Sequence, residues 1–280
     1  MVINDFISYL QVYTTSRETI RTYVKGVRRF LAYCDSNGLS PDPTALRRFV
    51  AHLNANGASD STIATYFFAA KSYLEYLGHD VSSLKPPRVT KKRIEDVPSI
   101  EDINKLIDRI PELRDKVLIA VGYDIGARVS ELQHIRVKDV NIEEGIVRVG
   151  RVKKRSRGEP MEWGNVIYHW VPLRRITIPI LAEYMEYVEG TWLFPGKDGK
   201  PIHVNTIRYI CYKRTEEILG KRYGPHKLFR HARGTHLAQA GVSPFMIRDL
   251  LGHSNVSTTD AYVRQLTPEE LRATLPPEVL

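Results

Sequence analysis

Between residues 82 and 98 the chain loses the apolar periodicity that it shows on both sides of this stretch. The stretch reads SSLKPPRVTKKRIEDVP, and its adjacent Pro86 and Pro87 cannot continue a helix and favour extended backbone. The chain has 280 residues, which is enough for one large domain or two modest ones, each with a buried core. The break therefore predicts a domain at 1–81, a basic linker at 82–98 and a second domain at 99–266.

The composition is that of a globular protein with an excess of positive charge. Hydrophobic residues make up 42% and charged residues 26%, which is ordinary for folded domains and excludes wholesale disorder. The formal net charge is +9, and clustered Lys and Arg displace counterions from nucleic-acid phosphates. Many soluble proteins carry excess charge only for solubility, so composition alone leaves a nucleic-acid partner open.

Cysteine usage and the N-terminus predict a cytoplasmic protein. Cys34 and Cys211 lie far apart within helical patterns, so a reducing compartment is expected and a disulfide framework is not. The N-terminal residues, MVINDFISYL, lack the basic start and the cleavage site of a signal peptide. No segment approaches the roughly eighteen apolar residues of a membrane span, so no membrane partner is expected.

The first domain is predicted to contain four helices. Thr15 and Glu18 have the spacing of a capping box, and apolar residues follow at helical spacing until Gly38. A shorter apolar stripe ends at Gly57, and Ser59 opens the last helix. Basic side chains lie on the first long helix away from its apolar stripe: Arg17, Arg21, Lys25, Arg28 and Arg29. They form either a solvated face or a surface for DNA.

The second domain is predicted to combine helices with a small β region. Ser99 and Asp102 cap its first helix, and a strongly apolar helix follows before the sequence GARVSELQHI. Here Arg128 and Glu131 are neighbours on a helix, so Glu131 could orient Arg128, or the two could form an ordinary surface ion pair. The alternating segments IVRVGRV and IYHWVPL predict a hairpin with a long basic tip, and helices then resume. The fold class is mainly α with a small β-hairpin or sheet.

The histidines at the C-terminal end of the chain do not predict a metal site. His226, His231 and His236 are spaced by five residues, which turns successive side chains away from a common face of an α-helix. The i, i+4 pair of a helical zinc site is absent, and no CxxC motif supplements these histidines.

The stretch from 226 to 262 instead predicts phosphoryl transfer to a side chain. Lys227, Arg230 and His231 fall within five residues, His253 follows, and Tyr262 comes nine residues later. A phosphodiester under attack gains negative charge on its nonbridging oxygens, which guanidinium groups can stabilise. A tyrosine can act as the nucleophile, and a lysine on the hairpin could protonate the leaving oxygen.

The order of these motifs resembles that of the tyrosine recombinase (integrase) family, in particular its Xer-like members. The resemblance spans residues 97–265 and rests on GARVSEL, the basic hairpin, KLFRHARGTHLAQAG and LLGHSNVSTTDAYV. It implies a helical SAM-like core-binding domain followed by a catalytic domain. The family's functional positions fall on Arg128 with its companion Glu131, on Lys153 with Lys154 as a close competitor, on Arg230, on His253 and on the nucleophile Tyr262.

One motif departs from the family's pattern. The family's box reads His-x-x-Arg-His, and aligning Arg230 and His231 with it puts Lys227 in place of the first histidine. His226 lies one residue too early. Lys227 is therefore expected at this position, with His226 as the alternative and His231 in a supporting role. Only a histidine could readily carry a proton at neutral pH.

The resemblance implies a site-specific DNA recombinase that needs no metal, ATP or other cofactor. Tyr262 would attack a phosphodiester, forming a 3′-phosphotyrosyl link and freeing a 5′-hydroxyl that later attacks a partner strand. The reaction would serve either chromosome dimer resolution or the integration of a mobile element. The alternatives are a type IB topoisomerase and a DNA-binding protein that has lost catalysis.

The expected partner is double-stranded DNA with a specific target site, at the nucleoid. The free protein would be a monomer or dimer and would form a homo-tetramer on two synapsed sites, with the tail at 267–280 as a candidate subunit contact. The residues expected to contact DNA are Arg21, Lys25, Arg28, Lys91, Lys92 and Arg155.

Overall fold

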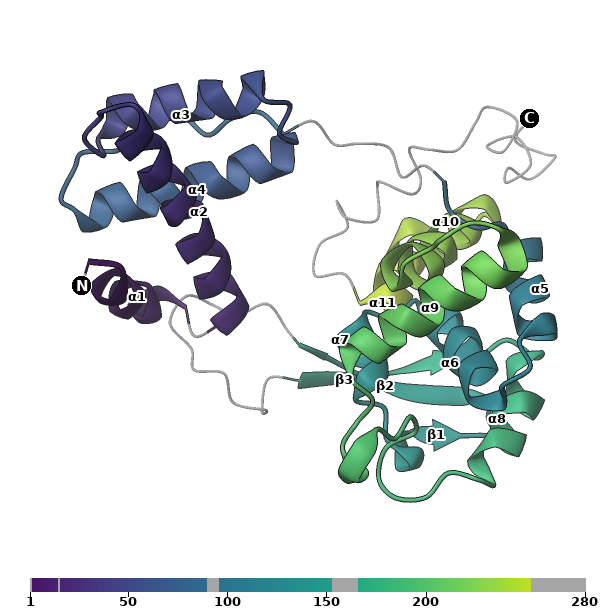
Figure 1. Ribbon diagram of the computed structural model, residues 1–280. Helices are drawn as coiled ribbons and strands as arrows, with labels where there is room; N and C mark the ends of the chain where they lie inside the picture. Colours follow the sequence, from purple (N-terminus) through teal and green to yellow (C-terminus); the bar gives the residue numbers. More distant parts are fainter. Residues whose placement is uncertain (1, 15, 90–95, 153–165, 253–280) are drawn as a thin grey trace. The chain divides into compact units, whose positions relative to one another are not determined.

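The computed structural model describes residues 2–14, 16–89, 96–152 and 166–252 (Figure 1). These residues fall into two compact units, one up to residue 89 and one from residue 96 onward. Among them, no helix combines the length and the apolar character that a membrane crossing requires.

The N-terminal unit contains the four predicted helices: α1 (Val2–Tyr13), α2 (Arg17–Ser36), α3 (Pro43–Ala55) and α4 (Asp60–Tyr76). The predicted capping box at Thr15 is wrong by one residue, because the hydroxyl of Ser16 accepts the N–H of Thr19 and caps α2. Thr15 itself lies outside the described residues. Ser59 caps α4 as expected, by accepting the N–H of Thr62.

Close contact between α2 and α4 organises this unit. A Cβ added at Gly26 of α2 would lie 2.7 Å from the Cβ of Ala69 in α4, so the glycine lets the two helices approach closely. The core on one side of this contact holds fully buried Phe30, Leu46 and Leu74. The stripe of apolar residues that defined α2 in the sequence therefore faces inward, and its basic residues face solvent.

The second unit surrounds the buried helix α6. Its helices are α5 (Ile100–Arg109), α6 (Leu113–Asp124), α7 (Val129–Gln133), α8 (Thr177–Met185), α9 (Val204–Leu219), α10 (Ala232–Gln239) and α11 (Pro244–Leu251). Short 3₁₀ turns cover Val137–Asp139 and Lys197–Gly199, and a π-helical turn covers His226–His231. The strands β1 (Val140–Asn141), β2 (Ile146–Val152) and β3 (Val166–Pro172) form an antiparallel sheet in the order β1-β2-β3.

These elements confirm the predicted fold class, a mainly α protein with a small antiparallel sheet. The predicted hairpin is β2 with β3, paired from Ile146 opposite Pro172 to Val152 opposite Val166, and β1 adds a short third strand. The basic tip of the hairpin and the C-terminal tail lie outside the described residues.

Two glycines, one in α6 and one just after it, position the segments that carry the candidate site residues. The π-helical turn lies directly on α6, because a Cβ at Gly122 would come within 2.9 Å of the ring of Phe229. At its C-terminal end, Gly126 has a φ of +57°, which a residue with a side chain rarely adopts, and this turn leads straight into α7. The chain therefore presents Arg128 at the junction of two helices.

Candidate active site

Arg128 is held by a buried carboxylate. It is the residue that precedes α7, and Glu131 Oε2 accepts its backbone N–H at 2.9 Å while Glu131 Oε1 accepts its Nη1 at 2.5 Å. The Glu131 side chain is 6% exposed and that of Arg128 is 46% exposed. The pair is therefore no ordinary surface ion pair: the carboxylate is fixed inside the fold, and it fixes one edge of a guanidinium whose remainder faces solvent.

Arg230 reaches the same turn from the other end of the sequence. It is 3% exposed and its Nη1 donates to the carbonyl oxygen of Gly126 at 3.1 Å. Because Gly126 is two residues before Arg128, this bond holds Arg230 against the turn that leads to Arg128, about a hundred residues earlier in the chain. The structure thus places one of the two arginines nominated for binding a phosphate against the turn that leads to the other.

A π-helical turn carries Arg230, and it corrects one sequence-based interpretation. The expectation that residues five apart diverge assumed an α-helix, but i→i+5 hydrogen bonding over His226–His231 brings its first and last residues together. The imidazole rings of His226 and His231 lie edge to face with centroids 4.1 Å apart. Such turns are rare and frequently occur at functional sites. No pattern in the sequence predicts this π-helical turn.

Both imidazoles are held neutral at pH 7. Removal from water is the largest cause of the lowered pKa of His226, followed by repulsion from Arg230 and Arg128. Burial also lowers the pKa of His231 to about 4, with further contributions from His226, Arg230 and Lys227. His226 is therefore an unprotonated imidazole whose pKa both arginines lower, and it can accept a proton.

Lys227 has a different partner. Its Nζ lies 3.7 Å from Oδ2 of Asp96, and both side chains are about half exposed. Asp96 also accepts hydrogen bonds at 3.1 Å from the Nζ of Lys221 and from the hydroxyl of Tyr223. These bonds, that of Lys221 first, lower the pKa of Asp96 and keep it charged. Lys227 thus lies beside a fixed carboxylate at the start of the second unit.

Sequence reasoning missed Arg151, a buried arginine near the C-terminal end of β2. It is 4% exposed, and its guanidinium donates to carbonyl oxygens of α11 and of the residue that ends α6. A signal was present in the strand pattern: Val147, Val149 and Arg151 share one face, and the first two are fully buried. An arginine at an inward-facing position requires partners inside the fold.

Several of the nominated residues lie outside the described part of the chain. They are Lys153, Lys154, Arg155, His253, Tyr262, Lys91 and Lys92. Within the described residues, no three His, Cys, Asp or Glu side chains are grouped so that they could hold a metal ion.

The three basic residues nominated on α2 are exposed, and two of them border a polar groove. Arg21 and Lys25 face Ser61, Thr62 and Thr65 at the start of α4 across a hollow of about 480 Å³. Arg28 lies one turn further along α2. Guanidinium, ammonium and hydroxyl donors on one exposed face suit a phosphate backbone.

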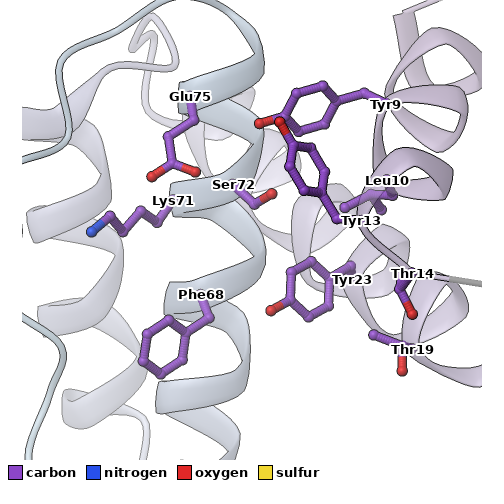
Figure 2. Close-up of a pocket in the computed structure, with 10 residues that line it drawn as sticks. All are labelled: Tyr9, Leu10, Tyr13, Thr14, Thr19, Tyr23, Phe68, Lys71, Ser72 and Glu75. Carbon is purple, nitrogen blue, oxygen red and sulfur yellow. The ribbon is translucent and has the colours of Figure 1, made fainter. Parts of the chain in front are cut away.

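A second hollow in this unit, of about 430 Å³, has a different character (Figure 2). Figure 2 shows Tyr9, Tyr13 and Tyr23 of α1 and α2 opposite Lys71 and Glu75 of α4. None of the described residues with a candidate catalytic role lines it. It therefore does not belong to the candidate active site.

Comparisons with known proteins agree with the motif order. The phage integrase family matches residues 97–269, and the N-terminal SAM-like domain of phage integrases matches residues 3–80. The tyrosine recombinase XerA of Thermococcus kodakarensis is 32% identical over 97% of this chain and 93% of its own length. The XerA of Pyrococcus furiosus is 30% identical over 94% of this chain and 89% of its own.

Solved structures share the fold at low sequence identity. The XerH recombinase bound to its difH substrate before cleavage matches with a TM-score of 0.69 at 21% identity, covering 91% of this chain and 78% of that one. The Tn1549 transposon integrase in complex with circular intermediate DNA matches with a TM-score of 0.69 at 18% identity, covering 97% of both chains.

Proposed function

This chain belongs to the phage integrase family and is a site-specific recombinase that cleaves and rejoins DNA, and we propose that Arg128 and Arg230 hold the phosphodiester that Tyr262 attacks. The observation that carries the proposal is the bond from Arg230 to Gly126, which holds the Arg230 guanidinium against the turn that leads to Arg128. Preorganised cations of this kind stabilise the charge that develops on the nonbridging oxygens.

The proposed step exchanges one phosphoester bond for another. The Tyr262 oxygen forms a bond to phosphorus, the bond from phosphorus to the 5′-oxygen breaks, and the 5′-oxygen leaves as a hydroxyl. Lys153, or its neighbour Lys154, donates the proton to that oxygen, and the phenol proton passes to a neutral base. Rejoining is the reverse attack by a 5′-hydroxyl on the 3′-phosphotyrosyl link. The energy of the ester is conserved, so the step requires no ATP.

For the ambiguous box position we propose His226 rather than Lys227. The π-helical turn supports this choice, because the one additional residue in the turn compensates for a histidine that lies one position early. The neutral imidazole beside Arg128 and Arg230 supports it as well. Lys227, already near Asp96, would contribute positive charge at the rim.

Two single substitutions test this assignment through covalent adduct formation on a nicked suicide DNA. We expect His226→Ala to slow the adduct by roughly 10²- to 10⁴-fold, the usual contribution of a general acid or base. Lys227→Ala should cost less than about fivefold, because an exposed charge contributes about 1 kcal/mol or less. A larger loss for Lys227→Ala than for His226→Ala would reverse the assignment.

We propose that the exposed face of α2 contacts the backbone of double-stranded DNA through Arg21, Lys25 and Arg28, and that Lys91, Lys92 and Arg155 extend this contact. Each phosphate contact contributes about 0.9 to the slope of log K against log salt concentration. Replacing the three α2 residues with Gln should therefore reduce the slope by roughly 2 to 3. Arg48→Gln, an exposed arginine on α3, is the control and should leave the slope unchanged.

We further propose that the protein assembles as a homo-tetramer on two synapsed target sites at the nucleoid, with the tail at 267–280 contacting a neighbouring subunit. A recombinase must hold two duplexes together, whereas a topoisomerase needs one. Light scattering of the protein with target DNA should give four chains and two duplexes in one complex. A complex that stays at one chain per duplex throughout the reaction would contradict the proposal.

A further inference from the structure

The guanidinium of Arg151 lies where the C-terminal ends of two helices meet. Its Nη2 donates to the carbonyl oxygen of Leu250 at 2.5 Å and, over a longer 3.4 Å, to that of Ile125. Its Nη1 donates to the carbonyl oxygen of Asp249 at 3.2 Å. Carbonyls in the last turn of a helix have no partner within the helix and carry partial negative charge. One side chain from the sheet thus caps both α11 and α6.

This arrangement is costly for the fold. Burial lowers the pKa of Arg151, and nearby Arg128 lowers it further while Glu131 opposes the effect. Among the described residues its hydrogen-bond partners are carbonyls only, with no carboxylate. Val147 and Val149 fill the same face of β2, so an apolar side chain would suit the position, and buried charges are often neutral or destabilising relative to well-packed apolar groups. The cost of burying the charge therefore offsets part of what the bonds to the two helix ends contribute to stability.

Two of the bonded carbonyls belong to residues that precede proposed catalytic residues by a few positions in the sequence. Ile125 precedes Arg128 by three residues, and Leu250 precedes His253 by three. Arg151 itself precedes Lys153 by two residues. Because only two residues separate Ile125 from Arg128, a bond that holds the Ile125 carbonyl also restrains the turn that carries Arg128.

Gly252 packs against the Arg151 side chain, and its backbone conformation fits this close contact. Gly252, the residue between Leu251 and His253, has a φ of +62°, and a Cβ at this position would overlap the Arg151 side chain. The left-handed turn that leads to His253 is therefore shaped around the guanidinium. In the same region a Cβ at Gly126 would overlap Leu251, so α11 lies directly against the turn before Arg128.

We propose that Arg151 is a positioning residue that fixes the end of α11 against the turn that carries Arg128. This inference rests on the proposed function of Arg128. A planar guanidinium with several fixed donors can bridge two helix ends, whereas an ammonium group offers a single point charge. Arg151 acts on the reaction only through the residues that it positions.

The test separates positioning from folding and from DNA binding. Arg151→Met keeps the length and packing of the side chain, and Arg151→Lys keeps its charge. For both variants we expect an unchanged Kd for target DNA, while adduct formation at saturating DNA falls, by about 100-fold for Arg151→Met, as a 1 Å misplacement can cost. Arg148→Met, on the same strand but paired with Asp139 and partly exposed, is the control and should react like the parent.

Hydrogen exchange provides a second readout in the same proteins. Peptides that cover 249–253 and 125–128 should exchange faster in Arg151→Met than in Arg148→Met at equal melting temperature. A reaction rate equal to that of the parent in both Arg151 variants would overturn the inference. The inference would also be overturned if a lower melting temperature explained the slower reaction of both Arg151→Met and Arg151→Lys. If the parent forms no adduct, the proposed function fails instead, so the two failures are distinguishable.

Discussion

The dependence of Arg128 on Glu131 yields a quantitative prediction. Glu131→Gln removes the charge that fixes the guanidinium and leaves an amide that can accept one of its two hydrogen bonds. Hydrogen bonds to charged groups contribute about 1.5–3 kcal/mol when buried. Because 46% of the Arg128 side chain is exposed, water replaces part of the lost interaction, and we reduce the expected cost to about 1–2 kcal/mol. This corresponds to an adduct rate that is roughly 5- to 30-fold lower.

The assay is single-turnover adduct formation on nicked DNA at saturating protein. Asp139→Asn is a matched control, because Asp139 repeats the architecture of Glu131 away from the site. Its side chain is 4% exposed, its Oδ2 accepts the N–H of Arg136 three residues earlier, and its Oδ1 pairs with Arg148. Both variants should lose similar stability, and only Glu131→Gln should lose rate. An unchanged rate in Glu131→Gln, or an equal loss in Asp139→Asn, would refute the reasoning.

Two further predictions concern charge around the π-helical turn. Asp96→Asn removes the carboxylate near Lys227 and Lys221. DNA affinity measured by fluorescence anisotropy should therefore increase by a few-fold at low salt and equal that of the parent at high salt. An unchanged affinity at low salt would count against a contact between Lys227 and DNA. Because folding lowers the pKa of His231 from 6.5 to about 4, the unfolded chain binds this proton more tightly. The contribution of neutral His231 to the free energy of unfolding should be complete above pH 6.5 and be lost as the pH falls toward about 4. In urea unfolding, the free energy of unfolding should therefore decrease less between these pH values in His231→Gln than in the parent.

Most elements of the fold could be predicted from local sequence rules. Ser99 and Asp102 form the capping box that their spacing indicates, and the alternating residues of β2 and β3 pair as a hairpin. These rules work because capping and burial depend on residues that are close in the sequence. Thr15 shows their limit: Glu18 three residues later makes it fit the capping-box pattern, yet Ser16, one position later, caps α2.

The candidate site was harder to predict, because its geometry depends on contacts between distant segments. On α-helical geometry the spacing of His226 and His231 predicts diverging side chains, whereas the π-helical turn brings the two rings together. That turn packs Phe229 against Gly122, about a hundred residues away. The buried position of Arg151 could be predicted from the alternation of β2, because Arg151 falls on the same face as Val147 and Val149. Its carbonyl partners at Ile125 and Leu250 could not, since nothing in the sequence marks a backbone oxygen as an acceptor for a distant arginine.

In the proposed reaction Tyr262 becomes covalently linked to DNA. The most direct measurement is covalent adduct formation by Tyr262→Phe on a nicked suicide substrate, followed by denaturing electrophoresis, with Tyr187→Phe as a control at a tyrosine that is 71% exposed. We predict that Tyr262→Phe binds the DNA with the affinity of the parent and forms no adduct, while Tyr187→Phe forms adduct at the parental rate. Adduct formation by Tyr262→Phe would show that another residue is the nucleophile.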